Sequence, residues 1–296
     1  MRQLVSGLMV AFALVAGCSV RRDDSPGRTS PAAVLPATQA ATGTSTPSAI
    51  DLLTNAVADH RLVLLGEIHG TRETPALVGT LVDRESAHGN KVVLGLEIIA
   101  RDQAGLDRYL HSSGSATDRA ALLSGSHWRE PMHDGRDSTA MFDLIEQVRR
   151  LRALGRDVSI VFFDPGNVDD RNRGMADNLR AVLSRQPDAR MLVLTGNVHA
   201  MTGPPPVMFD GDKRVELPMT AGRRLADLQP FSVDIEAATG EAWTCSGTCN
   251  VHPVVDRGAG AAAPSLELQD TSESPWNSVL LLPRFSASRP AIGISG

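Results

Sequence analysis

Short, continuous apolar runs alternate with amphipathic stretches along the chain after residue 50. Four runs have the length and composition of buried strands, and they span residues 61–68, 91–99, 158–164 and 190–199. Apolar residues at helical spacing lie between them and predict helices over 74–88, 101–112, 117–124, 138–154 and 171–186. Thr74 and Pro75 suit the N-cap and the first position of the first helix, and Ser138 suits the N-cap of the fourth.

The order of these elements predicts the fold class. Continuous apolar strands separated by helices are typical of an α/β fold with a mostly parallel central sheet and helices on both faces. Beyond residue 210, shorter apolar runs predict C-terminal strands that extend the sheet, with antiparallel pairing as one option; they span residues 214–218, 231–236 and 278–282. Residues 256–275 are predicted to form a loose polar loop, and residues 49–296 are expected to form one domain.

The N-terminus has the pattern of an export signal. Arg2 precedes an apolar run over residues 4–16, which is too short to span a bilayer as a helix. The run ends in Val15-Ala16-Gly17-Cys18, which resembles the lipobox of bacterial lipoproteins. This resemblance implies that residues 1–17 are a signal peptide and that Cys18 carries the lipid. An ordinary secretory leader, with Cys18 as a bystander, is the alternative.

Residues 18–48 are expected to tether the domain flexibly to the lipid, because small and polar residues dominate there without a periodic apolar pattern. No other segment reaches the roughly eighteen apolar residues that a membrane span needs, so the lipid alone would attach the chain to a membrane. Ser19 and Val20, rather than an acidic residue, follow Cys18. This resembles the sorting pattern of outer-membrane lipoproteins and predicts the periplasmic side of that membrane, or the cell envelope more broadly.

The composition excludes one class of function and indicates a covalent link. The net charge of −5 argues against nucleic-acid binding, which usually requires a basic stripe. Cys245 and Cys249 form a close pair, which in an oxidising compartment predicts a disulfide that closes a tight turn. A metal site with His252 is the weaker alternative, because a single pair of cysteines is poor evidence for zinc. The sequence gives no indication of the oligomeric state.

Polar side chains gather where the four central strands are predicted to end. The strand ends carry Glu67, His69, Glu97, Asp164, Asn197 and His199. Ligands bind at the carboxyl ends of the strands in open α/β sheets, so these residues are candidates for function. Glu67 and His69 are two residues apart and therefore project to one side of an extended segment. Gly66-x-x-His69 and Gly196-x-x-His199 repeat one arrangement, which strengthens the case for a shared site.

Two imidazoles and two carboxylates at one edge fit two kinds of chemistry. One is a divalent metal, Zn²⁺ or Mn²⁺, held by His69, His199 and Glu97 or Glu67, with an open position for water. The other is metal-free hydrolysis, in which His69 is the general base and the glutamates orient it. Both interpretations stay open at the level of the sequence.

Further residues near this edge are candidates for binding the substrate. Arg72 follows His69 closely and is able to clamp a carboxylate or phosphate, with a surface salt bridge as the alternative. Asp164 and Asn197 are the other candidates. His127 and His133 lie in a polar connection that is able to overhang the site, although structural or solvent-exposed roles are equally open.

Several motifs resemble a known group of proteins. The segments LLGEIHGTRETPAL (64–77), RNRGMADNL (171–179) and LTGNVH (194–199) are similar to the superfamily of erythromycin esterases, ChaN-type haem-binding lipoproteins and TraB/TIKI proteins. The resemblance covers most of residues 60–200. It implies a sheet-based α/β fold whose active edge carries Glu67, His69, Glu97 and His199.

The branches of this superfamily imply different activities. The paired Gly-x-x-His motifs with Glu97 resemble the TraB/TIKI pattern, which implies a metal-dependent peptidase, whereas erythromycin esterases have one more residue between the glutamate and the histidine. The lipid anchor and the Glu67–His69 spacing resemble ChaN, which implies haem binding; Tyr109, the single tyrosine, lies on a predicted helix and argues against tyrosinate ligation. We therefore expect a metal-dependent hydrolase of ester or peptide bonds in a small molecule or peptide, with haem or metal binding in iron uptake as the alternative.

Overall fold

The computed structural model describes residues 47–206, 208–210, 213–254 and 263–293. The chain divides into two units, residues 1–46 and residues 47–296, and the described residues all belong to the second. The predicted signal peptide, Cys18 and nearly all of the predicted tether therefore lie outside the described residues. Within the described part, no helix is long and apolar enough to cross a membrane.

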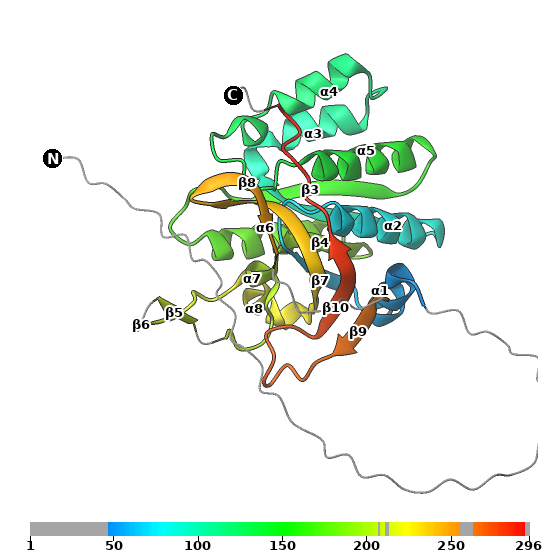
Figure 1. Cartoon of the computed structure of the whole chain (residues 1–296). Helices are drawn as coiled ribbons and strands as arrows, with labels where there is room; N and C mark the ends of the chain where they lie inside the picture. The colour runs from blue at the N-terminus through cyan, green and yellow to red at the C-terminus, as the bar shows by residue number, and fades with distance from the viewer. Residues whose placement is uncertain (1–46, 207, 211–212, 255–262, 294–296) are drawn as a thin grey trace, which may run out of the picture. The chain divides into compact units, whose positions relative to one another are not determined.

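A mostly parallel sheet lies at the centre of this unit (Figure 1). Its strands follow the order β3-β2-β4-β1-β7-β10-β9, and β8 pairs with β7 beside this path. The bounds are β1 Leu62–Glu67, β2 Val92–Ile99, β3 Val158–Asp164, β4 Arg190–Gly196, β7 Phe231–Ser246, β8 Thr248–Pro253, β9 Ser265–Leu268 and β10 Ser278–Phe285. β9 is antiparallel to β10 and β8 is antiparallel to β7, whereas the other neighbours are parallel. The predicted fold class is confirmed.

Helices cover both faces of the sheet, as the apolar character of the strands requires. One face packs against α1 (Ala49–Val57), α2 (Glu73–Ala87), α3 (Gln103–Leu110), α4 (Ala116–Leu123) and α5 (Thr139–Ala153). The other packs against α6 (Arg171–Arg185), α7 (Asn197–Ala200) and α8 (Ala221–Arg224). Every residue of β1 and β2 is buried as a result. Short 3-10 turns complete the list: η1 (Ala100–Asp102), η2 (His127–Arg129) and η3 (Ala226–Leu228).

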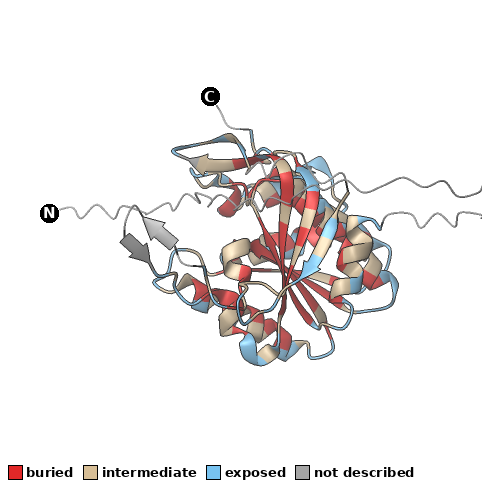
Figure 2. Cartoon of the chain, turned by 60° about the horizontal axis from the view of Figure 1, so that its bottom comes forward, coloured by how far each residue is buried: buried red, intermediate tan, exposed pale blue. Residues whose placement is uncertain are grey.

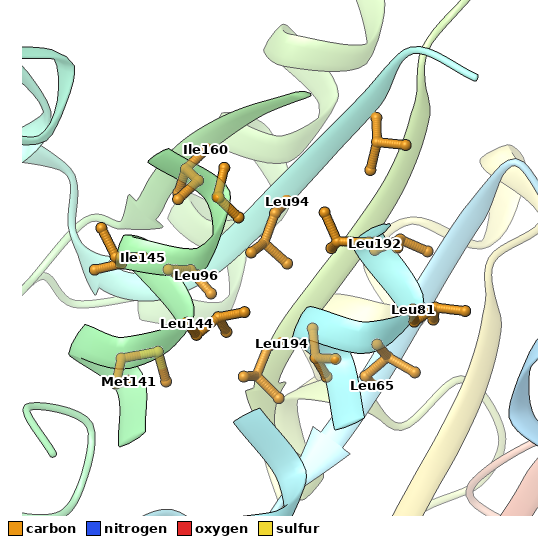
Figure 3. Close-up of a cluster of buried hydrophobic side chains, with 14 of the residues drawn as sticks. Leu65, Leu81, Leu94, Leu96, Met141, Leu144, Ile145, Ile160, Leu192 and Leu194 are labelled. Atoms are coloured by element: carbon orange, nitrogen blue, oxygen red, sulfur yellow. The ribbon is translucent and has the colours of Figure 1, made fainter. Parts of the chain in front are cut away.

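The larger core cluster lies between the sheet and the face of α2 and α5. Figure 2 shows the buried residues concentrated on the central strands and on the helix sides that face them. In Figure 3, Leu65, Leu94 and Leu194 of the sheet meet Leu81 of α2 and Leu144 of α5. Burial of each such side chain contributes roughly 1.5–3 kcal/mol, so this layer fixes the strands that carry the polar residues at their ends.

Local signals explain most helix boundaries, with two corrections. The Ser138 side chain accepts a hydrogen bond from the backbone N–H of Met141 and caps α5 as predicted. α2, however, begins at Glu73 with Arg72 at the N-cap, so Thr74 and Pro75 lie inside the first turn, where the missing N–H of proline costs nothing. The hydrophobic pattern did not predict α1, which a capping box between Ser48 and Asp51 starts.

The C-terminal part departs further from the expectation. The predicted strand at 214–218 does not extend the main sheet, because Lys213–Val215 (β6) pairs with Met208–Asp210 (β5) in a sheet of two strands. β7 is parallel to β1 and continues far beyond 231–236 to Ser246. Part of the predicted loop at 256–275 is the edge strand β9, while residues 255–262 lie outside the described residues.

The end of β7 forms a hairpin with β8 that carries the two cysteines. Cys245 and Cys249 face each other across the hairpin and form a disulfide with a separation of four residues in the sequence. The predicted disulfide is confirmed. Gly247 lies between them with φ +76°, the left-handed conformation that a tight turn requires.

Candidate active site

Glu67 and His69 form a hydrogen-bonded pair at the carboxyl end of β1. Glu67 is the last residue of the strand and is 3% exposed. Its Oε1 lies 2.9 Å from Nδ1 of His69, so Nδ1 donates the proton of this bond, and in the neutral imidazole Nε2 has the lone pair. Burial raises the pKa of Glu67. Burial lowers the pKa of His69, but the Glu97 and Glu67 carboxylates outweigh it and the pKa is raised.

Glu97 is the centre of the cluster. The carboxylate is 3% exposed, and its Oε2 accepts hydrogen bonds from Oγ1 of Thr195 at 2.6 Å and from the backbone N–H of Gly196 at 2.7 Å. Both donors belong to β4, the neighbouring strand. These bonds fix the carboxylate and turn Oε1 toward the two histidines, at 3.7 Å from Nε2 of His69 and 3.8 Å from Nε2 of His199.

His199 lies on α7 rather than on the end of β4, which stops at Gly196. Its Nδ1 lies 2.8 Å from Oδ1 of Asn172, and this oxygen also accepts from the backbone N–H of Ala221 at 3.0 Å. Oδ1 is therefore the acceptor and Nδ1 of His199 is the donor. Nε2 then accepts from Arg171 at 3.0 Å. Burial lowers the pKa of His199, so the neutral imidazole is the form that fits these contacts.

Two arginines complete the cluster. Arg171, at the start of α6, donates to Oε1 of Glu97 at 2.7 Å and to Oδ2 of Asp164 at 2.6 Å. Arg136, in the connection before α5, donates to Asp164 at 2.9 Å and to Asp134 at 2.9 Å. Burial alone would raise the pKa of Glu97, but its neighbours His199, His69, Arg171 and Arg136 hold it well below its usual value. Burial likewise raises the pKa of Asp164, and the Arg171 guanidinium outweighs this and lowers it.

The structure brings together most of the residues that the sequence singled out. Glu67, His69, Glu97, Asp164 and His199 are in contact or share a contact partner. Their strands end at one edge of the sheet, as expected for an open α/β fold. Arg171 and Asn172 lie in the RNRGMADNL segment that resembles the superfamily, but the sequence predicts no role for them or for Arg136 and Asp134. Their contacts depend on where two distant loops meet the sheet.

Arg72 and Asn197 are placed differently. Nε of Arg72 donates to the backbone carbonyl of Ala287 at 3.0 Å, and its side chain lines a groove of about 520 Å³ between α2 and α5. Among the described residues, it makes no hydrogen bond or ion pair with the cluster. Asn197 begins α7, and its carbonyl accepts a hydrogen bond from Nε1 of Trp276 at 3.0 Å. The substrate-binding roles of both residues stay predictions.

The predicted metal site at His69, Glu97 and His199 does not fit this arrangement. The guanidinium of Arg171 lies within hydrogen-bond distance of both Oε1 of Glu97 and Nε2 of His199, the atoms that a metal would need. Arg136 adds a second positive charge 3.6 Å from the same carboxylate oxygen. A divalent cation would have to displace the first guanidinium and face the second. Within the described ranges, no group of three or more His, Cys, Asp or Glu side chains is arranged to hold a metal ion.

The two histidines of the overhanging connection lie outside the cluster. His127 is 4% exposed, and burial together with the charge of Arg136 lowers its pKa to about 4. It is therefore neutral at physiological pH. His133 forms a hydrogen bond through Nδ1 with the Asp137 carboxylate.

No protein-family model matches the chain, and no curated protein is significantly similar to it in sequence. Among solved structures, a variant of the erythromycin esterase EreC in its open conformation is similar with a TM-score of 0.60 and 12% identity, over 82% of this chain and 95% of that one. A succinoglycan biosynthesis protein is similar with a TM-score of 0.56 and 11% identity, over 80% and 91%. A protein from Bacillus cereus is similar with a TM-score of 0.51 and 12% identity, over 83% and 94%. The resemblance to erythromycin esterases is thus confirmed at the level of the fold.

Proposed function

We propose that this chain is a hydrolase of ester or peptide bonds that works without a metal ion and uses His69 as the general base. The Glu67–His69 pair carries the proposal. The buried carboxylate holds the Nδ1 proton, so the lone pair of Nε2 points into the cluster. Within the described ranges, Nε2 makes no hydrogen bond of its own, and the imidazole is 21% exposed. A basic nitrogen with this orientation and access to solvent is able to activate water.

The proposed reaction begins with a water molecule beside Nε2 of His69. The nitrogen takes a proton from the water as its oxygen adds to the carbonyl carbon of the substrate. Glu67 and Glu97 stabilise the imidazolium that results, as their effect on the pKa of His69 indicates. The proton then passes from Nε2 to the leaving oxygen or nitrogen as the bond to the carbonyl carbon breaks.

The arginines supply the second requirement of acyl transfer. Negative charge develops on the carbonyl oxygen in the tetrahedral intermediate, and fixed positive charge nearby stabilises it. Arg136 and Arg171 are held by Asp164 and keep two guanidinium groups beside Glu97. His199 acts as a positioning residue, because its neutral imidazole accepts a hydrogen bond from Arg171.

Hydrolysis of p-nitrophenyl acetate before and after exhaustive treatment with EDTA tests both parts of this proposal. We expect activity to survive chelation and to fall at least about 100-fold in His69→Ala, the smallest effect typical of a lost general base. His88→Ala is the matched control, because His88 is exposed at the end of α2. Equal activity in His69→Ala would contradict the assignment of the base, and activity lost on chelation and restored by Zn²⁺ would favour the metal-dependent mechanism.

Haem binding is the alternative function, and its test uses the same protein. Tyr109 is not available as a ligand, because it is 3% exposed and donates a hydrogen bond to Glu146 at 2.8 Å. Burial raises the pKa of Tyr109 to about 12, which disfavours the tyrosinate. A Soret shift on titration with haem that disappears in His199→Ala would support the alternative.

We also propose that the chain is an exported lipoprotein attached through Cys18, on the lipobox-like sequence before this residue. Metabolic labelling with a palmitate analogue tests it. Label that is absent from Cys18→Ala supports the proposal, and equal labelling of both proteins contradicts it.

A further inference from the structure

Trp243 connects two loops that belong to the candidate active site. It lies on β7, two residues before Cys245, and is 4% exposed. Its backbone N–H donates to the carbonyl of Gly70 at 2.9 Å, and its indole Nε1 donates to the carbonyl of His133 at 2.8 Å. One loop carries His69 and the other carries Arg136. A single residue from a distant strand therefore bonds to the segments of the proposed base and of an arginine.

The three segments meet through their backbones. Gly70 has φ +75° and Gly135 has φ +100°, conformations that side chains rarely adopt. A Cβ atom on Gly135 would lie 2.7 Å from the carbonyl oxygen of Trp243 and 2.5 Å from the backbone nitrogen of Gly70. A Cβ on Gly70 would overlap the carbonyl of Trp243. The contact leaves no space for side chains, so a shift of any one segment displaces the other two.

The hairpin is the part of β7 that reaches this contact. β7 pairs with β1 only over Phe231–Asp234, and the residues from Glu241 to Ser246 pair with β8 instead. Trp243 therefore lies beyond the part of β7 that pairs with β1 and β10. The Cys245–Cys249 disulfide closes the hairpin two residues further on. Beyond the hairpin, Arg289 lies over the Trp243 ring at 5.7 Å.

We propose that Trp243 is a positioning residue of the active site, which holds the Asp134–Arg136 segment against the His69 loop through the hydrogen bond from Nε1 to His133. The proposal rests on the proposed function, because it assigns Trp243 a role in that reaction. The ring fills space as any buried aromatic residue does, but the indole N–H adds a directed bond to the chain three residues before Arg136. Asp134 in turn holds the guanidinium of Arg136, because Oδ1 lies 3.1 Å from Nε and Oδ2 lies 2.8 Å from Nη2.

Trp243→Phe isolates this bond, because it removes the Nε1 donor and keeps an aromatic ring. Hydrogen exchange in the full chain, read by mass spectrometry on peptides that cover residues 133–137, measures the loop directly and needs no substrate. We expect about fivefold faster exchange there, the factor that follows from the loss of one hydrogen bond. Trp128→Phe is the matched control: Trp128 is buried in the same connection, and its Nε1 has no hydrogen-bond partner among the described residues. Unchanged exchange in Trp243→Phe, or equal acceleration in both variants, would overturn the proposal.

A double-mutant cycle tests whether Trp243 acts through Arg136. In the wild-type background, Trp243→Phe is expected to lower kcat for p-nitrophenyl acetate about tenfold with little change in KM. In an Arg136→Ala background, the same change is expected to have no further effect. Two independent, multiplying losses would show that Trp243 does not act through Arg136. A wild-type protein that lacks esterase activity but shows the loop response would instead contradict the proposed function alone.

Discussion

Substitution of Glu97 by glutamine tests the electrostatic design of the site most directly. A carboxylate offers two acceptor oxygens, whereas the amide of glutamine offers one oxygen and one N–H₂ group. If the amide nitrogen replaces Oε2, its N–H groups face the Thr195 hydroxyl and the Gly196 N–H. Both of these groups donate to Oε2 in the wild type, so they lose their acceptor. If it replaces Oε1, it opposes the guanidinium of Arg171. Either orientation therefore breaks a charge-assisted contact in a buried place.

The cost follows from these contacts. The less costly orientation keeps the two bonds on Oε2 and loses the bond to Arg171, which as a bond to a charged group is worth about 1.5–3 kcal/mol. The second guanidinium, Arg136 at 3.6 Å, also loses its compensating charge. Removal of one partner from a buried ion pair typically costs about 3–5 kcal/mol. We expect Glu97→Gln to lower the free energy of unfolding by about 4 kcal/mol at neutral pH.

Urea unfolding, followed by circular dichroism at neutral pH and stepwise below pH 4.5, measures this cost. Positive neighbours hold the pKa of Glu97 below its ordinary value of 4.5, so its contribution is complete above that pH and is lost as the pH falls through the folded-state pKa. The difference between wild type and variant should therefore shrink under acid conditions. Glu130→Gln is the control, because Glu130 pairs with Arg101 at 3.6 Å on the surface and should cost less than about 1 kcal/mol. Equal stability of Glu97→Gln and wild type at neutral pH would refute the reasoning.

Two further predictions concern the geometry around His69, and a third concerns the Cys245–Cys249 disulfide. Gly196→Ala should lower kcat at least about tenfold while the protein stays folded, because a Cβ there would lie 2.9 Å from Nε2 of His69. An unchanged kcat would show that the imidazole ring has room to move. The raised pKa of His69 predicts that kcat/KM falls with decreasing pH below an apparent pKa above 6.5, and Glu67→Gln should move this limb to lower pH, as a pH–rate profile measures. The double variant Cys245→Ser/Cys249→Ser should lose up to about 2 kcal/mol of stability in thermal unfolding, because a disulfide that closes a short loop stabilises by about this amount. Two free thiols in non-reduced wild-type protein would contradict the prediction.

The central strands were predictable because burial on both faces gives them an unambiguous sequence pattern. The prediction for β3 has the bounds of the structure, and the predicted α5 differs only by its N-cap Ser138 and its C-cap Leu154. The C-terminal strands were harder, since their pairing depends on partners far away in the chain. Apolar and polar residues alternate less clearly along β7. The strand also changes its partner from β1 to β8 along its length, which no local pattern indicates.

The candidate site shows the same division between local and distant information. Glu67 and His69 were recognisable because they stand two residues apart beside glycines at the end of an apolar run. The roles of Arg136 and Arg171 were not, although Arg171 lies in the RNRGMADNL segment, because their contacts with Glu97 form only where distant parts of the chain meet. Their guanidinium groups lie beside Glu97, where the sequence predicts a metal ion. A sequence that shows acidic and imidazole ligands does not reveal which cation they face.

The position of β4 affects the way in which the chain is able to mature. β4 lies between β1 and β2 in the sheet, and within the described part β1 pairs only with β4 and β7, both of which come more than a hundred residues later. Contacts over such separations form slowly, because the entropic cost of closing a long loop comes before the contacts can stabilise the chain. In the folded sheet, β4 with Thr195 and Gly196 lies between the strands that carry Glu67 and Glu97. A nascent chain that ends before this strand already contains both glutamates and His69, yet it lacks the strand whose Thr195 and Gly196 bind Glu97.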